Sequence, residues 1–330
     1  MLKKIIVLIA IPLTIVLSVF IIVKNVSAAT DQDLLIESVS FEPAQPLLNQ
    51  TVKIIIRAKY IGSSSLTSNI GVNNVAFSHK DFQTQTSSLT GASVVPSPAY
   101  PLYSGTYFTY TIVGKFTDTG TKSLVLKIDG ANALKETNET NNTFKPQVKV
   151  LKIGDLIKLP TDPAVYIIKS DLKKHLYVNG PTFWSYYIGS WSNIKLDDWP
   201  IFIQEVSQAA FDSLPIGNNI VVKAGSRLIK FPNSSKIYTV FGEAKLKLMT
   251  DQKGADLYGS DWKNKVVTIQ NGFEADYTIT ETGFVDFDND GLTDDDERNI
   301  YHTDPAKADT DGDSYKDGVE VLNNYNPNVY

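Results

Sequence analysis

The sequence of 330 residues contains no cysteine, only two methionines and only three histidines. The absence of cysteine excludes disulfide bonds, thiol catalysis and cysteine-ligated zinc sites. The histidines, His79, His175 and His302, form no HExxH pattern, and the chain has neither a GxSxG motif nor a phosphate-binding GxxxxGK loop. We therefore expect a protein without catalytic activity.

The N-terminal residues 1–29 have the pattern of an export signal. Lys3 and Lys4 precede an apolar run from Ile5 to Val23, and the small residues Ala28 and Ala29 follow at the position of a cleavage site. The run is also about long enough to span a bilayer, so a retained membrane anchor is the alternative. In both cases the rest of the chain is expected to be secreted or at the cell surface. An exported chain without disulfides favours a bacterial envelope.

Acidic residues are unevenly distributed along the chain. Between Asp286 and Glu320 there are 13 of the 36 acidic residues but only three of the 31 basic ones, so this segment carries a formal charge of −10. The remaining residues carry +5 within a total of −5. This distribution indicates a local site or tail, since the protein is not acidic throughout.

Residues 30–151 have the apolar alternation of a β-sandwich. In TVKIIIRAKY the residues Val52, Ile54, Ile56 and Ala58 alternate with polar ones, and the segments YFTYTIVGKF and KSLVLKID show the same period. Short strands separated by turns rich in serine, threonine, glycine and proline predict an antiparallel sandwich.

The ends of this region, DLLIESVSFEPAQP and KIDGANALKETNETNNTF, resemble the bacterial CARDB domain, an Ig-like module of cell-surface and secreted proteins. The chain departs from the family pattern at Asn49-Gln50, where glycine is usual, and at Tyr60, where asparagine is usual. In the family the last hairpin carries acidic and amide side chains, which here are Asp129, Asn132, Glu136, Asn138, Glu139, Asn141 and Asn142. We expect them to close turns, with a metal or ligand role as the alternative.

Residues 152–283 contain an internal duplication. GDLIKLPTDPAVYII at 154–168 recurs as GSRLIKFPNSSKIYTV at 225–240, and YIGSW at 187–191 corresponds to YGSDW at 258–262. We expect two copies of a small β-rich α+β unit, at about 154–222 and 225–280, each with a short helix before its Gly-Ser-Trp segment.

All four tryptophans lie in this duplicated region. Trp191 and Trp262 are equivalent in the two copies, which predicts a core position that each copy must fill. Trp184 and Trp199 have no counterpart in the second copy and are the better candidates for an exposed contact, for example with a glycan.

The stretch DFDNDGLTDDDE, residues 286–297, has the spacing of a calcium-binding loop, D-x-D-x-D-G-x5-E. Calcium takes six to eight oxygen ligands, which alternate Asp side chains, one backbone carbonyl and a closing glutamate can supply. The pattern repeats in DTDGDSYKDGVE, residues 309–320, with Ser314 in place of the glycine Gly291. The predicted ligands are Asp286, Asp288, Asp290, Leu292, Asp294 and Glu297 in the first loop, and Asp309, Asp311, Asp313, Tyr315, Asp317 and Glu320 in the second.

The loops, followed by HTDPAKADTDGD and NYNPN, resemble the thrombospondin type 3-like calcium repeats of bacterial surface proteins, which implies a short calcium-binding module at 284–330. An EF-hand would need a long helix before the loop, which GFVDFDND does not offer, and Pro305 and Pro327 shorten the space for the helices of a dockerin. A disordered acidic tail is the remaining alternative. Because the segment has few apolar side chains, we expect calcium to fold it.

The sequence as a whole predicts a mainly β, exported, noncatalytic calcium-binding protein of the cell surface, with a role in adhesion or envelope scaffolding. Its expected cofactor is Ca²⁺ and its expected partner is a cell-surface protein or a glycan. We do not expect the protein to bind nucleic acid, and we expect it to contact a membrane only through an uncleaved N-terminal segment. The alternatives are a glycan- or wall-binding protein that uses the aromatics of the duplicated region, and a calcium-dependent docking accessory of a secreted enzyme system.

Overall fold

The computed structural model describes residues 32–63, 65, 75–91, 103–132, 134, 136–186 and 203–329. They belong to two compact units, of which the first extends to Ile153 and includes Ser207–Leu214, and the second contains Gly154–Val206 and Pro215–Tyr330. The expected export signal lies outside the described residues. Among the helices that the structure does describe, none is both long and apolar enough to cross a membrane.

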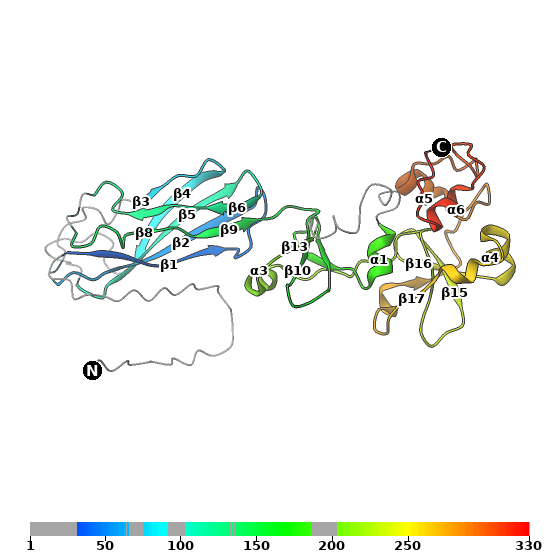
Figure 1. Cartoon of the computed structure of the whole chain (residues 1–330), viewed down its shortest axis with the longest axis horizontal. Coiled ribbons are helices and arrows are strands. Elements are labelled where there is room, and N and C mark those ends of the chain that lie inside the picture. Colours follow the sequence, from blue (N-terminus) through cyan, green and yellow to red (C-terminus); the bar gives the residue numbers. More distant parts are fainter. Residues whose placement is uncertain are drawn as a thin grey trace. The chain divides into compact units, whose positions relative to one another are not determined.

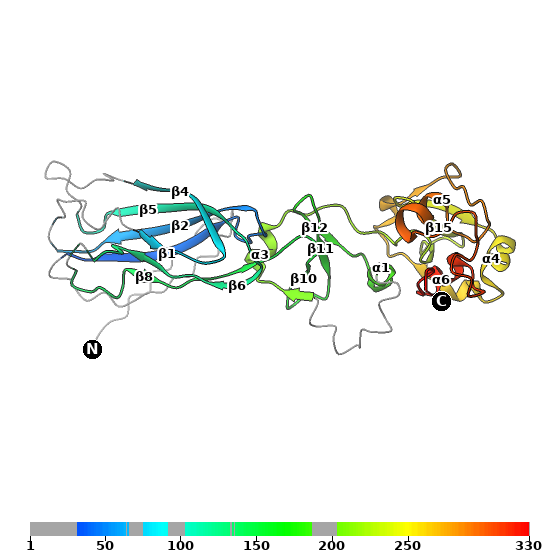
Figure 2. The same ribbon diagram turned by 90° about the horizontal axis from the view of Figure 1, so that it is seen from above.

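The first unit is a β-sandwich (Figures 1 and 2). One sheet has the order β1-β2-β5-β4 with all neighbours antiparallel, and a three-stranded sheet β3-β7-β8 and a pair β6-β9 complete the unit. The strands are β1 Leu34–Glu42, β2 Thr51–Tyr60, β3 Val75–Phe77, β4 Phe82–Gly91, β5 Tyr107–Phe116, β6 Gly120–Ser123, β7 Leu126–Ile128, β8 Thr143–Phe144 and β9 Gln147–Val150.

The predicted alternation is confirmed in β2, where Val52, Ile54, Ile56 and Ala58 are fully buried and the residues between them are exposed or half-buried. Their side chains belong to one core with those of the neighbouring strand β5 and of β7 in the three-stranded sheet. This burial of one face per sheet is the main source of stability in an antiparallel sandwich. A short helix, α3 (Gln208–Ser213), belongs to the same unit, and the Gln45 backbone nitrogen donates to Ser213 Oγ at 3.1 Å.

The second unit contains two β-β-β-α-β repeats with the same strand pairing. In each, the first strand pairs antiparallel with the second and parallel with the strand that follows the helix (β13 or β17), and the second pairs antiparallel with the third. The first repeat comprises β10 Leu156–Lys158, β11 Tyr166–Ile168, β12 Lys174–Leu176, α1 Gly180–Ser185 and β13 Ile203–Glu205. The second comprises β14 Leu228–Lys230, β15 Ile237–Phe241, β16 Lys245–Met249, α4 Asp251–Tyr258, the 3-10 turns η2 Trp262–Lys265 and η3 Glu274–Asp276, β17 Val266–Thr268 and β18 Thr278–Ile279.

The two repeats have separate hydrophobic clusters. The cluster of the first repeat includes Leu156, Tyr177 and Phe183. In the second repeat, Trp262 is buried with Leu257 and Tyr258, and Gly254 of α4 lies against its indole ring, where a Cβ atom would come within 2.6 Å. The expectation of a core position is thus confirmed for Trp262, while Trp191 and Trp199 lie outside the described residues.

The C-terminal segment has little regular structure: α5 (Asp294–Asp296), the π-helical turn η4 (Glu297–Tyr301) and α6 (Asp317–Leu322). It lies beside β15 and α4 of the second repeat in both views (Figures 1 and 2). The described chain is mainly β, as the sequence predicts.

Candidate metal centre in the C-terminal loops

The first acidic loop is bent by two residues with left-handed backbone, Asn289 (φ 62°) and Gly291 (φ 109°). The bend is fixed by side-chain acceptors within the loop. The Asp290 backbone nitrogen donates to Asp286 Oδ1 at 3.1 Å, and the Leu292 backbone nitrogen donates to Asp290 Oδ1 at 2.8 Å. Such bonds are typical of aspartate-rich turns.

Carboxylates converge in three groups. Each group holds one ligand atom per residue, and within a group these atoms all lie within 4.8 Å of one another. The groups are Asp286, Asp288 and Asp290; Asp290, Glu297 and Asp317; and Asp309, Asp311 and Asp313. Asp290 belongs to two of them and is therefore the common element of the first loop's site.

The second of these groups, which contains Asp290, Glu297 and Asp317, joins the two loops. Asp290, Glu297 and Asp317 are each fully buried, and the backbone nitrogen of Gly318 in α6 donates to Asp290 Oδ2 at 2.8 Å. The spacing of the sequence assigned Asp317 to the second loop, whereas the structure also brings it to the carboxylates of the first. Sequence reasoning could not find this contact, because it depends on how α6 packs against the first loop.

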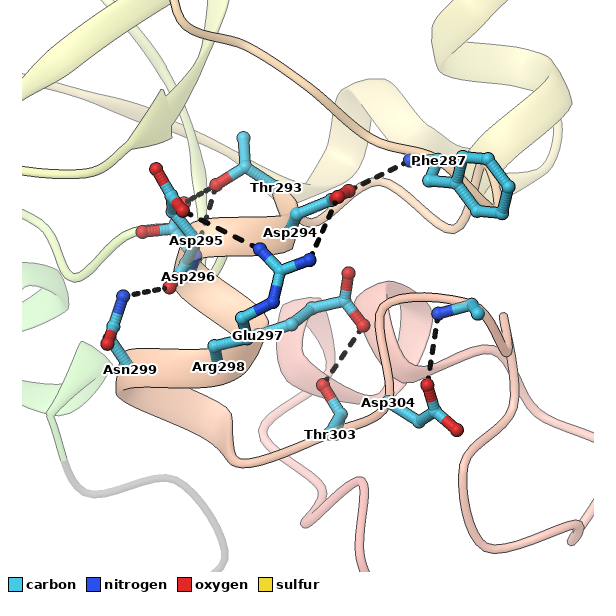
Figure 3. A network of polar contacts seen from close by, with 11 residues as sticks. Phe287, Thr293, Asp294, Asp295, Asp296, Glu297, Arg298, Asn299, Thr303 and Asp304 are labelled. Atoms are coloured by element: carbon cyan, nitrogen blue, oxygen red, sulfur yellow. Dashed lines mark hydrogen bonds and ion pairs between the residues drawn. The ribbon is translucent and has the colours of Figure 1, made fainter.

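Asp294 takes no part in these groups. Its Oδ1 accepts from the Phe287 backbone nitrogen at 3.0 Å, and its Oδ2 accepts from the Arg298 guanidinium at 3.3 Å (Figure 3). Glu297, by contrast, accepts from Thr303 Oγ1 at 3.2 Å through one oxygen only. Asp294 thus orders the loop backbone, while Glu297 keeps an oxygen available for a ligand.

The second loop is similar in plan and more open to solvent. Asp309 accepts from the backbone nitrogens of Gly312 and Ser314, at 2.7 and 2.8 Å, and Asp313 accepts from that of Tyr315 at 2.8 Å. Ser314 has a φ of 83°, a conformation that favours glycine. The side chains of Asp309, Asp311 and Asp313 are half-buried, and the Tyr315 side chain is exposed.

Several buried carboxylate oxygens of the two loops have no hydrogen-bond partner. They are Asp286 Oδ2, both oxygens of Asp288, Glu297 Oε2, Asp311 Oδ2 and Glu320 Oε2. Buried polar atoms nearly always have a partner, so six such oxygens in one small region are evidence for a cation. The residues present therefore fit a calcium site: the donors are all oxygen, and a flexible loop can supply many of them.

The raised pKa values of carboxyl groups in the loops also indicate a cation site. Burial, with added repulsion from neighbouring carboxylates, raises the pKa of Asp290 to about 7 and that of Glu297 to about 8. Burial and the charges of the second loop raise the pKa of Glu320 to about 7. Carboxylates with such pKa values carry an energetic penalty when ionised, which a bound divalent cation removes.

The first loop is docked on the second repeat. Leu292, Tyr301 and Val321 form a small buried cluster, and Gly225 lies so close that a Cβ atom there would come within 2.4 Å of Leu292 Cδ2. The Tyr301 hydroxyl donates to the carbonyl oxygen of Ala224. Leu322 of α6 extends the cluster around Trp262. The expectation that this segment has too few apolar side chains for a core is corrected, because it shares the core of the second repeat.

Polar contacts reinforce this docking. The Gly242 backbone nitrogen, in the turn between β15 and β16, donates to both carboxylate oxygens of Asp296 at 3.0 and 3.2 Å. Arg227 donates to the carbonyl oxygen of Leu322 at 3.0 Å. A Cβ atom added to Gly291 would come within 2.6 Å of the Tyr258 hydroxyl. Glycine at this loop position therefore permits both the bend and the contact with the repeat.

Comparison with family models assigns two parts of the chain. Residues 31–146 match the family model CARDB. The matched residues make up the N-terminal sandwich, which is called the CARDB domain below after this match. Residues 286–308 match the model of the bacterial TSP3 repeat, so the first acidic loop is part of a TSP3 repeat. The match ends just before the second loop. No curated protein matches the chain.

Three solved structures are similar to part of this chain. A solution structure from Pyrococcus furiosus is 16% identical and covers 37% of this chain and 97% of its own, with a TM-score of 0.24. A crystal structure of a CARDB domain from the same organism, in complex with di-metal ions, is 16% identical over 38% of this chain and 95% of its own, with a TM-score of 0.25. A domain described as part of a cell surface protein of Methanosarcina acetivorans is 22% identical and covers 37% of this chain and 94% of its own, with a TM-score of 0.23.

In the CARDB domain, part of the Asp, Asn and Glu set of the last hairpin closes turns, as expected. Asp129 Oδ2 accepts from the Leu134 backbone nitrogen at 2.8 Å, and Asn138 Oδ1 accepts from that of Thr140 at 3.1 Å. Asp129 and Asn132 have positive φ values of 47° and 50°, which these residue types tolerate. Lys127 donates to Asn132 Oδ1.

The aromatic candidates for a glycan contact are only partly accessible. Trp184 is half-buried against the cluster of the first repeat, with its ring edge-to-face with Phe183 at 5.0 Å between centroids. Tyr186 is more accessible, at 41% exposure, and stands edge-to-face with Tyr177.

Proposed function

We propose that this protein is an exported, noncatalytic protein of the cell surface that binds calcium through its TSP3 repeat and the adjoining second loop. Its role would be adhesion or envelope scaffolding. The observation that carries the proposal is the set of buried, unpartnered carboxylate oxygens in the two loops. The CARDB domain and the TSP3 repeat support a surface location.

Calcium is the ion that this donor set favours. The converging groups offer carboxylate oxygens only, without the cysteine or histidine ligands that zinc sites usually contain. Magnesium requires near-ideal octahedral geometry and keeps several waters, whereas calcium accepts the irregular, carboxylate-rich shell of a loop. Extracellular sites of this kind bind at about 0.1–1 mM, so calcium outside the cell would fill them.

Calcium bound in the first loop would also stabilise the packing of the loop on the second repeat. Leu292 is the residue whose carbonyl the loop pattern assigns to the ion, and its side chain is buried against Tyr301 and Val321. Asp317, which begins α6, joins the buried carboxylate group. An ion held by these groups would therefore fix α6 and the loop on the repeat at the same time, and its binding free energy would stabilise both.

The decisive measurement is calcium binding by the full chain in isothermal titration, with Asp290→Asn beside Asp295→Asn. The Asp295 side chain is 85% exposed and lies in the same segment, outside the carboxylate groups, so it is a matched control. We expect Asp290→Asn to weaken binding at least about tenfold, or about 1.4 kcal/mol, and Asp295→Asn to leave it unchanged. Equal binding by the two variants would refute the site.

The partner is proposed to be a surface protein or a glycan. The accessible Tyr186 beside the half-buried Trp184 is the observation that keeps a glycan among the candidates. Binding to a glycan array that is lost in Trp184→Ala would support this second function. Copurification of one stoichiometric protein only in the presence of calcium would instead support the docking accessory of a secreted enzyme system.

A further inference from the structure

Four asparagines in the described part of the chain begin the pattern Asn-x-Ser/Thr, in which x is any residue except proline. They are Asn49, Asn138, Asn141 and Asn233. Exported proteins carry N-linked sugars at this pattern, in which the asparagine amide accepts the sugar and a hydroxyl lies two residues later. So short a pattern often arises by chance, and burial and hydrogen bonding therefore decide which of these positions can react.

Asn141 is buried and already engaged. Its side chain belongs to a residue that is 7% exposed, and its Nδ2 donates to both carboxylate oxygens of Asp33, each at 3.1 Å. Thr143, which supplies the hydroxyl of this motif, lies in β8 and pairs with Lys127 of β7. A transferase would have to break these contacts before it could reach the amide, so Asn141 is not an acceptor in the folded domain.

Asn138 is exposed and lies in the loop between β7 and β8. Its Oδ1 accepts from the Thr140 backbone nitrogen at 3.1 Å and from the Thr140 hydroxyl at 2.7 Å. Among the residues that the structure describes, Asn138 Nδ2 has no hydrogen-bond partner. The two functional residues of this motif are therefore in contact, and the nitrogen that would carry a sugar is free.

The other two exposed positions lack this contact. Asn49 precedes β2, whose first residue, Thr51, supplies the hydroxyl of the motif, and Asn233 lies with Ser235 in the turn between β14 and β15. Within the described chain, neither of these hydroxyls is bonded to the asparagine of its own motif. Asn138 therefore combines the pattern with exposure, a bonded hydroxyl and a free amide nitrogen.

We propose that Asn138 is an acceptor for N-linked glycosylation, with a sugar joined through its C1 atom to a lipid phosphate as the donor. In the transfer, Asn138 Nδ2 attacks C1 and forms the new nitrogen–carbon bond. The bond between C1 and the phosphate oxygen breaks, and that oxygen leaves with the electron pair. The Nδ2 proton passes to a base of the transferase, so the reaction needs neither an oxidant nor a reductant.

Thr140 is the positioning residue of this site. Because its hydroxyl and its backbone nitrogen both donate to Asn138 Oδ1, they draw electron density toward that oxygen and ease the removal of a proton from Nδ2. Asn141 Oδ1, by contrast, has no donor. The inference rests on the proposed function in one respect, since the pattern is used in exported proteins.

The test is mass spectrometry of the full protein isolated from its own cells. Trypsin releases residues 136–149 as one peptide, because Lys145 precedes a proline, and this peptide contains both Asn138 and Asn141. Electron-transfer fragmentation, which leaves a glycan on its side chain, locates the added mass. We expect at least one hexosyl or N-acetylhexosaminyl residue on Asn138, none on Asn141, and a lower occupancy at Asn49 and Asn233.

Variants of the two hydroxyls sharpen the test. Thr140→Ala keeps Asn138 but removes the hydroxyl, so it is expected to abolish the modification, whereas Thr140→Ser should retain it. Thr143→Ala removes the hydroxyl of the Asn141 motif in the same peptide, so it is a matched control and should change nothing. A Thr140→Ala chain that is modified as fully as the wild type would overturn the assignment.

The wild-type measurement depends on no variant being able to fold. An unmodified Asn138, or a sugar on Asn141 in its place, would overturn the proposal. The same spectra show whether the N-terminal segment has been removed, and cell fractionation shows whether the chain has reached the surface. An unmodified Asn138 in a surface chain would refute glycosylation alone, whereas an unmodified chain retained in the cytoplasm would refute the proposed export as well.

Discussion

The two acidic loops have the same spacing of carboxylates but different surroundings. The first has Gly291 at its sixth position, buries Asp290 and Glu297, and packs Leu292 into a core shared with the second repeat. The second has Ser314 there, keeps its three converging aspartates half-buried, and exposes Tyr315.

The difference shows that ligand spacing alone does not set the strength of a site. A pattern of alternating aspartates brings oxygens together in both loops, but only the first aspartate group contains a fully buried member, Asp290, which also lies with the buried Glu297 and Asp317 where charges interact strongly. Asp317 adds to this asymmetry, because the second loop lends a carboxylate to the first. We therefore expect the first loop to be the tighter and the more important for stability.

The largest effect is expected from Gly291→Ala. At φ 109° an alanine is strained, and its Cβ would overlap the Tyr258 hydroxyl, so we expect a loss of roughly 2–4 kcal/mol in the free energy of unfolding. Gly312→Ala in the second loop, at φ 81° with nothing within 4 Å, should lose only about 1 kcal/mol. All four tryptophans lie in the second unit, so denaturation followed by tryptophan fluorescence in saturating calcium reports on it. Similar losses in both variants would contradict the proposed asymmetry.

The next effect concerns the shared carboxylate. Asp317→Asn should weaken calcium binding at both loops, by roughly tenfold at the first, because its side chain lies with Asp290 and Glu297. Asp309→Asn should weaken the second loop alone. Isothermal titration of the two variants separates these outcomes, and an Asp317→Asn chain with an unaltered first binding step would show that the loops are independent.

The pH should also distinguish the loops from an ordinary acidic surface. The pKa of Asp290 is raised to about 7, that of Glu297 to about 8 and that of Glu320 to about 7. A raised carboxyl pKa means that the metal-free folded chain gains stability as pH falls from 8 through these values, since buried charge is neutralised. Calcium opposes protonation, so its stabilising effect should be larger at pH 8 than at pH 6. Thermal unfolding with calcium and with a chelator at both pH values measures this, and an equal calcium effect would argue against buried carboxylate ligands.

The smallest effect is expected from Ser314→Gly. Glycine relieves the strain of a φ of 83°, which is worth about 1 kcal/mol, so the second loop should bind calcium several-fold more tightly. The first binding step should not change. A second loop that binds no better, or more weakly, would mean that Ser314 itself contributes to the site.

The sequence could predict the loops because their ligands lie close together along the chain. The register of Asp286, Asp288 and Asp290 depends only on local turn geometry, and the structure brings these three together. The position of Asp317 beside Glu297 depends on the packing of α6, and no local pattern contains that information. For the same reason, the docking of Leu292 against Gly225 could not be predicted.

The sandwich and the tryptophans show the same difference between features that a local sequence pattern predicts and features that depend on packing. The alternation in β2 predicted its buried face, and the equivalence of the two copies predicted the burial of Trp262. The Asp, Asn and Glu residues of the CARDB hairpin were predicted to close turns, and Asp129 and Asn138 do so. The contact of Asn141 with Asp33 joins residues 108 positions apart, so it required the structure.

The docking of the TSP3 repeat has a mechanical consequence. If the protein is pulled between its ends, as an adhesive surface protein would be, tension applied at the C-terminus enters through α6 and must break the contacts of Leu322, Leu292 and Asp296 with the second repeat before that repeat can extend. These contacts are held by the same loop that would bind the ion. We expect the rupture force of this unit in single-molecule stretching to rise with external calcium, so that the medium sets how much load the unit can bear.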